Sequence, residues 1–192
     1  MRLAPSQVQR FYSIWKPLLL YTNERHKLVP RMSFDDPECI PDIQKLREAV
    51  WKDDAVLDMF ALENPTGLPK EDLSLVKSWQ HRVAGKFFIL RQLKKHAIFM
   101  ADNRVYAVLA LESFFEELVP QIPAYVEAIL LPFEGQIIYD TLLAPYPIVF
   151  GRGIQANMKE EYMAAKKRGE IIETLNTELP AVGVSQDCAV VA

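Results

Sequence analysis

The chain has 192 residues, of which 50% are hydrophobic and 24% are charged, and its formal net charge is −3. This composition is typical of a globular protein, because it has neither the low apolar content of a disordered chain nor the long apolar runs of a membrane protein. Arg2, Arg10 and Lys16 interrupt the apolar residues at the start, so we expect no signal peptide, no membrane association and a cytoplasmic location.

Residues 1–84 carry helical patterns separated by prolines. Ser6 can cap a first helix whose apolar residues fall on one face, with Pro17 as a kink or a restart within it. A turn is predicted at Asn64-Pro65-Thr66-Gly67. Three further helices are predicted at about residues 41–50, 55–62 and 69–83.

After Gly85 the pattern changes to short β-rich runs separated by turn residues. Tight turns are predicted at residues 102–103 and 134–135, and a short helix at residues 113–118. The run 105–111 is apolar on both alternating faces, so we place it centrally in the sheet. The predicted strands are residues 87–93, 97–101, 105–111, 125–133 and 136–143.

The last strong pattern is a helix over residues 154–168, ended by Gly169, with a strand expected within residues 170–175. The fold class is therefore α+β, with an N-terminal helical region, an antiparallel meander of about five strands and a closing C-terminal helix. We expect one domain over residues 1–180, divided into a helical part to residue 84 and a meander with its helix from residue 85. Residues 181–192 are expected to be a flexible tail.

Charge is segregated along the second half. Residues 73–101 hold six Lys or Arg and no acid, whereas residues 105–151 hold six acids and no Lys or Arg. Such segregation is typical of a binding face, or of neighbouring elements that neutralise each other. The sequence leaves both interpretations open.

A nucleic-acid or phosphate site in the basic stretch needs several cations on one face, with aromatic side chains beside them. Lys94, Lys95 and His96 form the one compact cluster, at a predicted turn, and Arg91 precedes it in the sequence. These residues, with Arg152, are the candidate anion-binding residues.

Arg152 belongs to a Gly-x-Gly-x-x-Ala pattern, Gly151 to Ala156, that opens the C-terminal helix. This pattern occurs in dinucleotide-binding folds, where glycines and free helix N–H groups approach a phosphate. Fewer than 40 residues follow Gly153, too few for the further βα units of such a fold. We interpret the pattern as a loop that enters a helix, in which Arg152 can help to hold a small anion.

Catalytic and metal-binding patterns are weak. Cys39 and Cys188 have no zinc spacing or nearby histidine, and neither His81 nor His96 belongs to a metal-ligand pattern. Among the acids of the predicted strands, Glu127 and Asp140 are at best diagonal neighbours across a hairpin. We therefore expect no cofactor and no metal, and do not expect an enzyme.

The first functional hypothesis is a non-catalytic protein-interaction or regulatory module that binds another protein or a second copy of itself. Its contact surface is expected at the meander edge or in the tail from Pro180. The alternative is a nucleic-acid or phosphate-binding protein that uses the basic stretch. A small metal-dependent hydrolase built on Glu127, Asp140 and Arg152 is the third hypothesis. The sequence fixes neither the ligand nor the oligomeric state.

Overall fold

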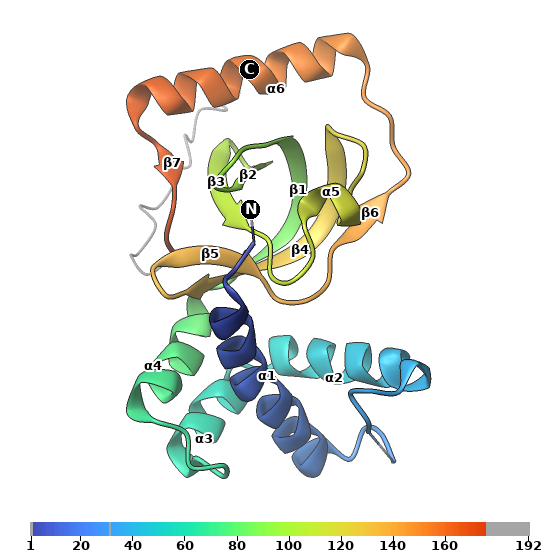
Figure 1. Ribbon diagram of the computed structural model, residues 1–192, viewed down its shortest axis with the longest axis vertical. Coiled ribbons are helices and arrows are strands. Elements are labelled where there is room, and N and C mark those ends of the chain that lie inside the picture. The colour runs from blue at the N-terminus through green and yellow to red at the C-terminus, as the bar shows by residue number, and fades with distance from the viewer. Residues whose placement is uncertain (1, 31, 176–192) are drawn as a thin grey trace, which may run out of the picture.

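Helices gather at one end of a β-barrel in the computed structural model, which describes residues 2–30 and 32–175 (Figure 1). Of the two remaining helices, one crosses the outside of the barrel far from this group, and one very short helix lies beside the barrel. The α-helices are α1 (Pro5–His26), α2 (Ile40–Lys52), α3 (Ala55–Glu63), α4 (Lys70–Ser78), α5 (Phe115–Leu118) and α6 (Arg152–Arg168), with short 3-10 turns η1 (Pro37–Cys39) and η2 (Trp79–His81).

The strands confirm the α+β class, but they close into a barrel instead of forming an open meander. They are β1 (Val83–Gln92), β2 (Ala97–Ala101), β3 (Arg104–Leu109), β4 (Ala124–Phe133), β5 (Gln136–Tyr139), β6 (Ala144–Tyr146) and β7 (Ile171–Ile172). The order around the barrel is β1-β2-β3-β5-β4, and β4 pairs back onto β1. β3 and β5 are parallel, β6 adds to β4, and β7 adds to β3.

Closure follows from the length of β4. Its first part pairs with β1, and its last four residues pair with β5, so one strand joins both ends of the sheet. The two predicted hairpin turns are confirmed. Asp102 and Asn103 both have positive φ, as do Glu134 and Gly135, which is the backbone geometry that two-residue hairpins require.

Element ends differ from the predictions where tertiary contacts decide them. Val83, expected at the end of a helix, starts β1, because it pairs with Leu130. Pro17 lies within α1 without ending it. β5 stops at Tyr139, because the next residue, Asp140, turns into the helical region.

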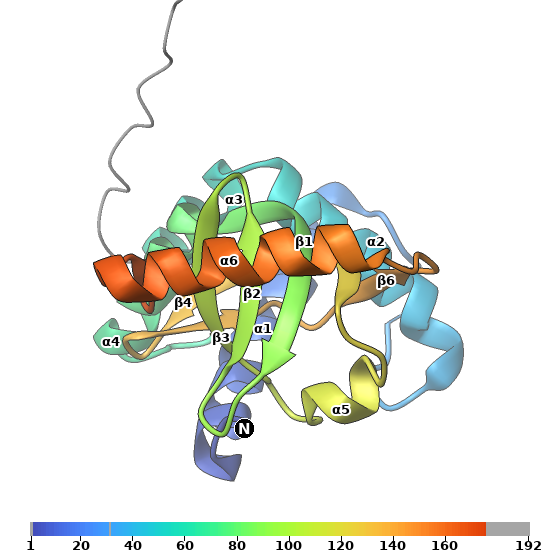
Figure 2. The same cartoon turned by 90° about the horizontal axis from the view of Figure 1, so that it is seen from above.

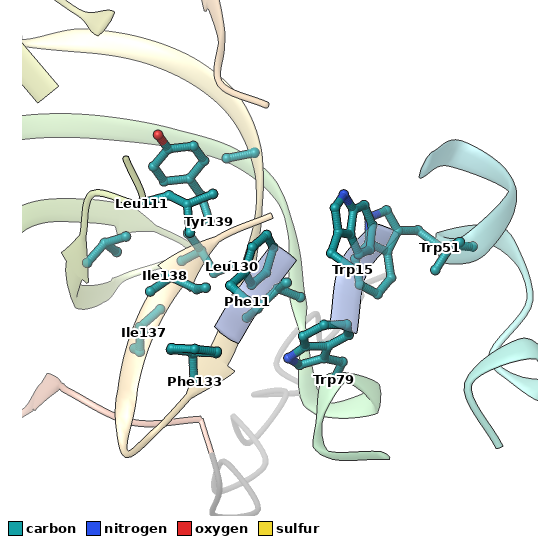
Figure 3. Close-up of a cluster of buried hydrophobic side chains, with 14 of the residues drawn as sticks. Phe11, Trp15, Trp51, Trp79, Leu111, Leu130, Phe133, Ile137, Ile138 and Tyr139 are labelled. Atoms are coloured by element: carbon teal, nitrogen blue, oxygen red, sulfur yellow. The ribbon is translucent and has the colours of Figure 1, made fainter. Parts of the chain in front are cut away.

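The helices and the barrel meet in a cluster of aromatic side chains (Figure 3). Trp15 of α1 stacks on Trp51 of α2 with ring centroids 5.3 Å apart, and Trp79 packs edge-on against both. Phe11 bridges this group to Phe133 of β4, and the Trp79 indole donates a hydrogen bond to the carbonyl of Pro132 at 3.2 Å. One hydrophobic cluster therefore runs from the helices into the barrel.

A buried ion pair crosses the same junction. The Asp140 carboxylate is fully buried and accepts hydrogen bonds from Arg47 Nε at 2.5 Å, Arg47 Nη2 at 3.0 Å and Trp51 Nε1 at 2.6 Å. Burial raises the pKa of Asp140, and the bonds from Arg47 and Trp51 oppose that shift. These bonds tie α2 to the end of β5.

α6 covers the outer face of β1, β2 and β3 (Figure 2). Met158, Tyr162 and Ala165 are buried against Ile98 and Met100, and other apolar residues of the barrel complete a second cluster. Gly169 ends the helix with φ of 70°, as predicted. This position of α6 defines the surface on which the candidate site lies.

Two further predictions concern membrane-spanning helices and the C-terminal end of the domain. No helix within residues 2–30 and 32–175 combines the length and the apolar character that crossing a bilayer requires. The predicted tail, 181–192, and the predicted domain end at residue 180 lie outside the described residues.

Candidate functional site

Three cationic side chains from two elements line one hollow of about 500 Å³ between β1 and α6. They are Arg91 on β1 and Arg152 and Lys159 on α6, and we call this hollow the basic cleft. Its remaining lining residues are Leu90, Pro123, Gln155, Ala156 and Tyr162, so no acidic side chain is among them. Within the described chain, the three cations take part in no salt bridge.

Local structure aims these side chains at the cleft. A bulge interrupts the pairing of β1 with β2 between Ile89 and Arg91, and such a bulge redirects the side chain that follows it. The Arg91 guanidinium lies 5.8 Å from the centroid of the buried Tyr162 ring, which holds it beside α6. Arg152 and Lys159 are two helical turns apart and therefore share a face.

The start of α6 adds to the positive potential of the cleft. Arg152 is the first residue of the helix, and the first turn holds no acidic residue. The N–H groups of a helix's first turn have no partners within the helix and carry the positive end of its dipole. An anion in the cleft is thus attracted by the side chains and by the helix end together.

A second hollow of about 460 Å³ opens from the cleft, and we call it the apolar groove. Residues 118–124 form one wall and residues 145–150 the other, and Pro123 and Gln155 line both hollows. No charged residue lines the groove. Its rim exposes Leu118 (36%), Ile122 (41%) and Val149 (91%), a concentration of apolar surface that is typical of interaction sites.

The predicted meander edge does not offer a comparable surface, because closure of the barrel pairs β1 with β4. Among the described strands, β6 ends the order of the sheet, and it has three residues with Pro145 at its centre. Pro145 and the following Pro147 have no N–H group to donate to an added strand. The groove walls, and not a strand edge, are the accessible feature on this side.

The structure brings together two of the five predicted anion-binding residues. Arg91 and Arg152 line the basic cleft, whereas Lys94 and Lys95 are exposed at the turn after β1 and do not line it. His96 closes that turn, its carbonyl accepting a 2.8 Å bond from the N–H of Leu93. Partial burial of His96 lowers the pKa of its imidazole, as does the charge of Lys95.

Sequence reasoning missed Lys159 and the whole apolar groove. A signal for Lys159 existed, because its spacing of seven from Arg152 places both on one face of a helix that was itself predicted. The groove had no such signal, since its two walls are more than twenty residues apart and meet only through the pairing of β4 with β6.

The basic and acidic stretches do not neutralise each other through ion pairs in the described residues. Glu134 pairs with Arg10 of α1, and Asp140 pairs with Arg47 of α2. Where the two stretches do meet, on the outer face of the barrel, Lys86 and Glu127 are cross-strand partners. The cations of the cleft therefore remain available to a ligand.

The three side chains on which the hypothesis of a metal-dependent hydrolase depends do not lie together. Glu127 is exposed on β4 and accepts a 2.7 Å bond from the Tyr146 hydroxyl, whereas Asp140 is buried against Arg47. These two carboxylates do not share a site, and Arg152 lies in the basic cleft with neither of them lining it. In residues 2–30 and 32–175, no group of three or more His, Cys, Asp or Glu side chains is placed to hold a metal ion.

The glycine pattern that opens α6 does not belong to a dinucleotide fold. Residues 147–150 form no strand, and α6 packs on the outside of a mostly antiparallel barrel instead of crossing between parallel strands. The loop interpretation of Gly151 to Ala156 fits this arrangement.

The barrel order β1-β2-β3-β5-β4, with a short helix before β4, is the strand order of an OB-fold, whose ligands commonly lie on strands 2 and 3. Here α6 buries Ile98 and Met100 of β2 on that face, so the usual ligand surface is covered. The strand order alone therefore assigns no ligand. Comparison of the chain with protein-family models, with curated proteins and with solved structures finds no match.

Proposed function

We propose that the protein is a non-catalytic binding protein that holds an acidic, apolar segment of a polypeptide in the basic cleft and the apolar groove. The observation that carries this proposal is the continuity of the two hollows. Three cations without an acid line one, an uncharged apolar surface lines the other, and Pro123 and Gln155 belong to both. A segment with apolar side chains beside carboxylates is complementary to both parts.

The character of the groove favours a polypeptide over a nucleic acid. Its exposed rim is aliphatic, whereas binding of single strands relies on open aromatic faces for base stacking. The nearby aromatic rings pack against one another: Tyr125 lies 5.4 Å from Tyr146, and Phe88 lies 5.2 Å from Phe150. Nucleic-acid binding stays the alternative, because Arg91 and Arg152 share one cleft.

The two hollows contribute differently to binding. Burial of apolar surface stabilises a complex by about 25 cal/mol for each Å², before the costs of association. Exposed ion pairs add about 0–1 kcal/mol each, and they act mainly on specificity and association rate. We therefore expect the groove to supply most of the affinity and the cleft to select acidic segments. A cytoplasmic location for this binding stays a prediction.

The test is the binding of a fluorescent peptide of alternating leucine and glutamate, measured by anisotropy at low salt. The variant Arg152→Glu/Lys159→Glu reverses two cleft charges and should weaken binding about tenfold or more. Lys166→Glu/Lys167→Glu is the matched control, because both lysines are exposed on the last turn of α6 and do not line the cleft. The control should bind as the unmodified protein does.

Two outcomes contradict the proposal. Equal peptide affinity for the cleft variant and the control shows that the cleft does not bind the acidic segment. Single-stranded RNA or DNA that binds the unmodified protein more tightly than the peptide, with an affinity that falls steeply with salt and is lost in the cleft variant, assigns the cleft to nucleic acid.

A further inference from the structure

An acidic and apolar ridge stands beside the apolar groove on the same molecule. It comprises Phe114, Glu116, Glu117 and Leu118, at and within α5, and all four are exposed. Leu118 also lines the groove, so the ridge and the groove are contiguous. The ridge therefore has the chemistry that the cleft and groove require of a ligand.

The ridge is held in shape before any partner binds. Phe115 is buried and anchors α5 to the barrel. The Glu117 carboxylate accepts a bond from the N–H of Phe114 at 3.2 Å, and the Arg2 guanidinium lies 4.8 Å from the centre of the Phe114 ring. A preformed segment loses little conformational entropy on binding, which favours it over a flexible one.

Exposed large hydrophobic side chains are concentrated on the ridge and the groove. Ten large hydrophobic residues of the described chain are exposed, and half of them belong to the ridge or the groove: Phe114, Leu118, Ile122, Ile148 and Val149. A contiguous apolar surface of this kind is typical of a contact with another chain. The charges beside it are of opposite sign, with Glu116 and Glu117 on the ridge and Arg152 and Lys159 in the cleft.

Resting on the proposed function, we infer that the segment bound in the cleft and groove is the ridge of a second copy of this chain. A surface that carries a site and its complement side by side is self-complementary under twofold symmetry. Each copy places its ridge in the groove of the other, so the dimer contains two equivalent contacts. Glu116 and Glu117 of each copy then face the cations of the partner's cleft.

The first experiment measures the mass of the full-length chain by light scattering across a wide range of concentration. The unmodified protein should be a dimer at high concentration. Glu116→Lys should raise the dimer dissociation constant about tenfold or more, and Arg152→Glu/Lys159→Glu should do the same. Lys166→Glu/Lys167→Glu should leave it unchanged. All these side chains are exposed, so at a concentration where the unmodified protein is a monomer, the unfolding temperature of each variant should differ from that of the unmodified protein only by the small effect of the changed charges at the helix ends.

The decisive experiment mixes the two disrupted variants, Glu116→Lys and Arg152→Glu/Lys159→Glu. In the mixed pair, Lys at position 116 of one copy faces Glu at positions 152 and 159 of the other, and the reciprocal contact keeps its native charges. At a concentration where each variant alone is a monomer, mixing should therefore restore the mass of a dimer. A contact outside the ridge and cleft does not predict this rescue.

A monomer at every concentration overturns this inference, as does a dimer that withstands both reversals or disrupted variants that mixing does not rescue. The outcome for the proposed function is separate. A monomer that still binds the leucine-glutamate peptide through Arg152 and Lys159 keeps the cleft as a binding site and rejects only the second copy as its occupant. A monomer that binds no peptide rejects both.

Discussion

Where α2 meets the barrel, the charges are buried and paired, whereas along α6 they are exposed and face a hollow. Arg47 and Asp140 bond to each other, and the indole of Trp51, which stacks on Trp15, also donates to Asp140. Arg91, Arg152 and Lys159 surround the basic cleft, and the described chain gives them no acidic partner. Both regions join elements that are distant in the sequence, but only one of them satisfies its own charges.

This contrast separates residues that hold the fold from residues that are free to bind. Removal of one partner from a buried pair leaves an uncompensated charge in a medium of low dielectric constant, which strongly destabilises the fold. Removal of an exposed cation leaves the fold almost unchanged, because water already solvates it. The two regions should therefore respond in opposite ways to substitution, in stability and in binding.

The largest expected effect is that of Arg47→Met at the junction. It leaves the buried Asp140 carboxylate with the Trp51 indole as its main donor, and should lower the free energy of unfolding by about 3–5 kcal/mol at neutral pH. Loss of Arg47 raises the pKa of Asp140 further, so this deficit should shrink as the pH falls and the carboxylate becomes protonated. Urea unfolding at several pH values measures both effects.

Arg152→Met is the control for that substitution. It removes the same type of side chain from the basic cleft, and it should change the free energy of unfolding by less than about 0.5 kcal/mol. A loss for Arg152→Met as large as the loss for Arg47→Met contradicts the distinction between the two regions.

An intermediate loss of stability is expected for Tyr162→Ala, because Tyr162 packs beneath α6 and also lines the cleft. Its buried ring packs in the cluster beneath α6 and supports the Arg91 guanidinium. The substitution should cost about 2–3 kcal/mol, less than a residue of the main core, and should increase hydrogen exchange in α6 before the barrel is affected. Uniform loss of protection over the whole chain contradicts a separately packed α6.

A smaller loss of stability is expected for substitution of Gly169, where only the backbone conformation opposes a side chain. Gly169 has φ of 70° at the end of α6, and an added Cβ meets no atom within 4 Å. Gly169→Ala should therefore cost about 1 kcal/mol through conformational strain alone, and Gly169→Asn less, because asparagine tolerates this conformation better. Thermal unfolding of both variants provides the comparison, and equal losses contradict a purely conformational origin.

Features set by neighbouring residues were predictable from the sequence. α6 was predicted within two residues at its start and ended at Gly169 as expected, because helical periodicity and a C-terminal glycine are local signals. The two hairpin turns and the buried β3 were found in the same way, from turn chemistry and alternation. These local signals sufficed for the α+β class.

Features set by long-range pairing were not predictable. Pairing of Val83 with Leu130 closes the barrel, and nothing in the periodicity of either strand selects that partner. Arg91 and Arg152 are 61 residues apart and meet because α6 folds back over β1, whereas Lys94 and Lys95, which follow Arg91 closely in the sequence, lie outside the cleft. Proximity along the chain was therefore a poor guide to the site.

The smallest expected effect is a change in the pH dependence of stability caused by His96. This side chain is half-buried, like Arg47 of the junction, but it has no ion-pair partner in the described chain, like the cations of the cleft. Burial lowers the pKa of its imidazole; Glu173 opposes that shift, and Lys95 adds to it. A histidine with a lowered pKa binds its proton more weakly in the folded state than in the unfolded chain, so stability is full above the unfolded pKa of 6.5 and declines as the pH falls through that value towards the folded pKa. His96→Gln should therefore lose less stability than the unmodified protein between pH about 7.5 and about 5.5, measured as the shift in urea midpoint. An identical shift for both proteins means that His96 is as well solvated in the fold as in the unfolded chain, which places it with the exposed turn residues Lys94 and Lys95.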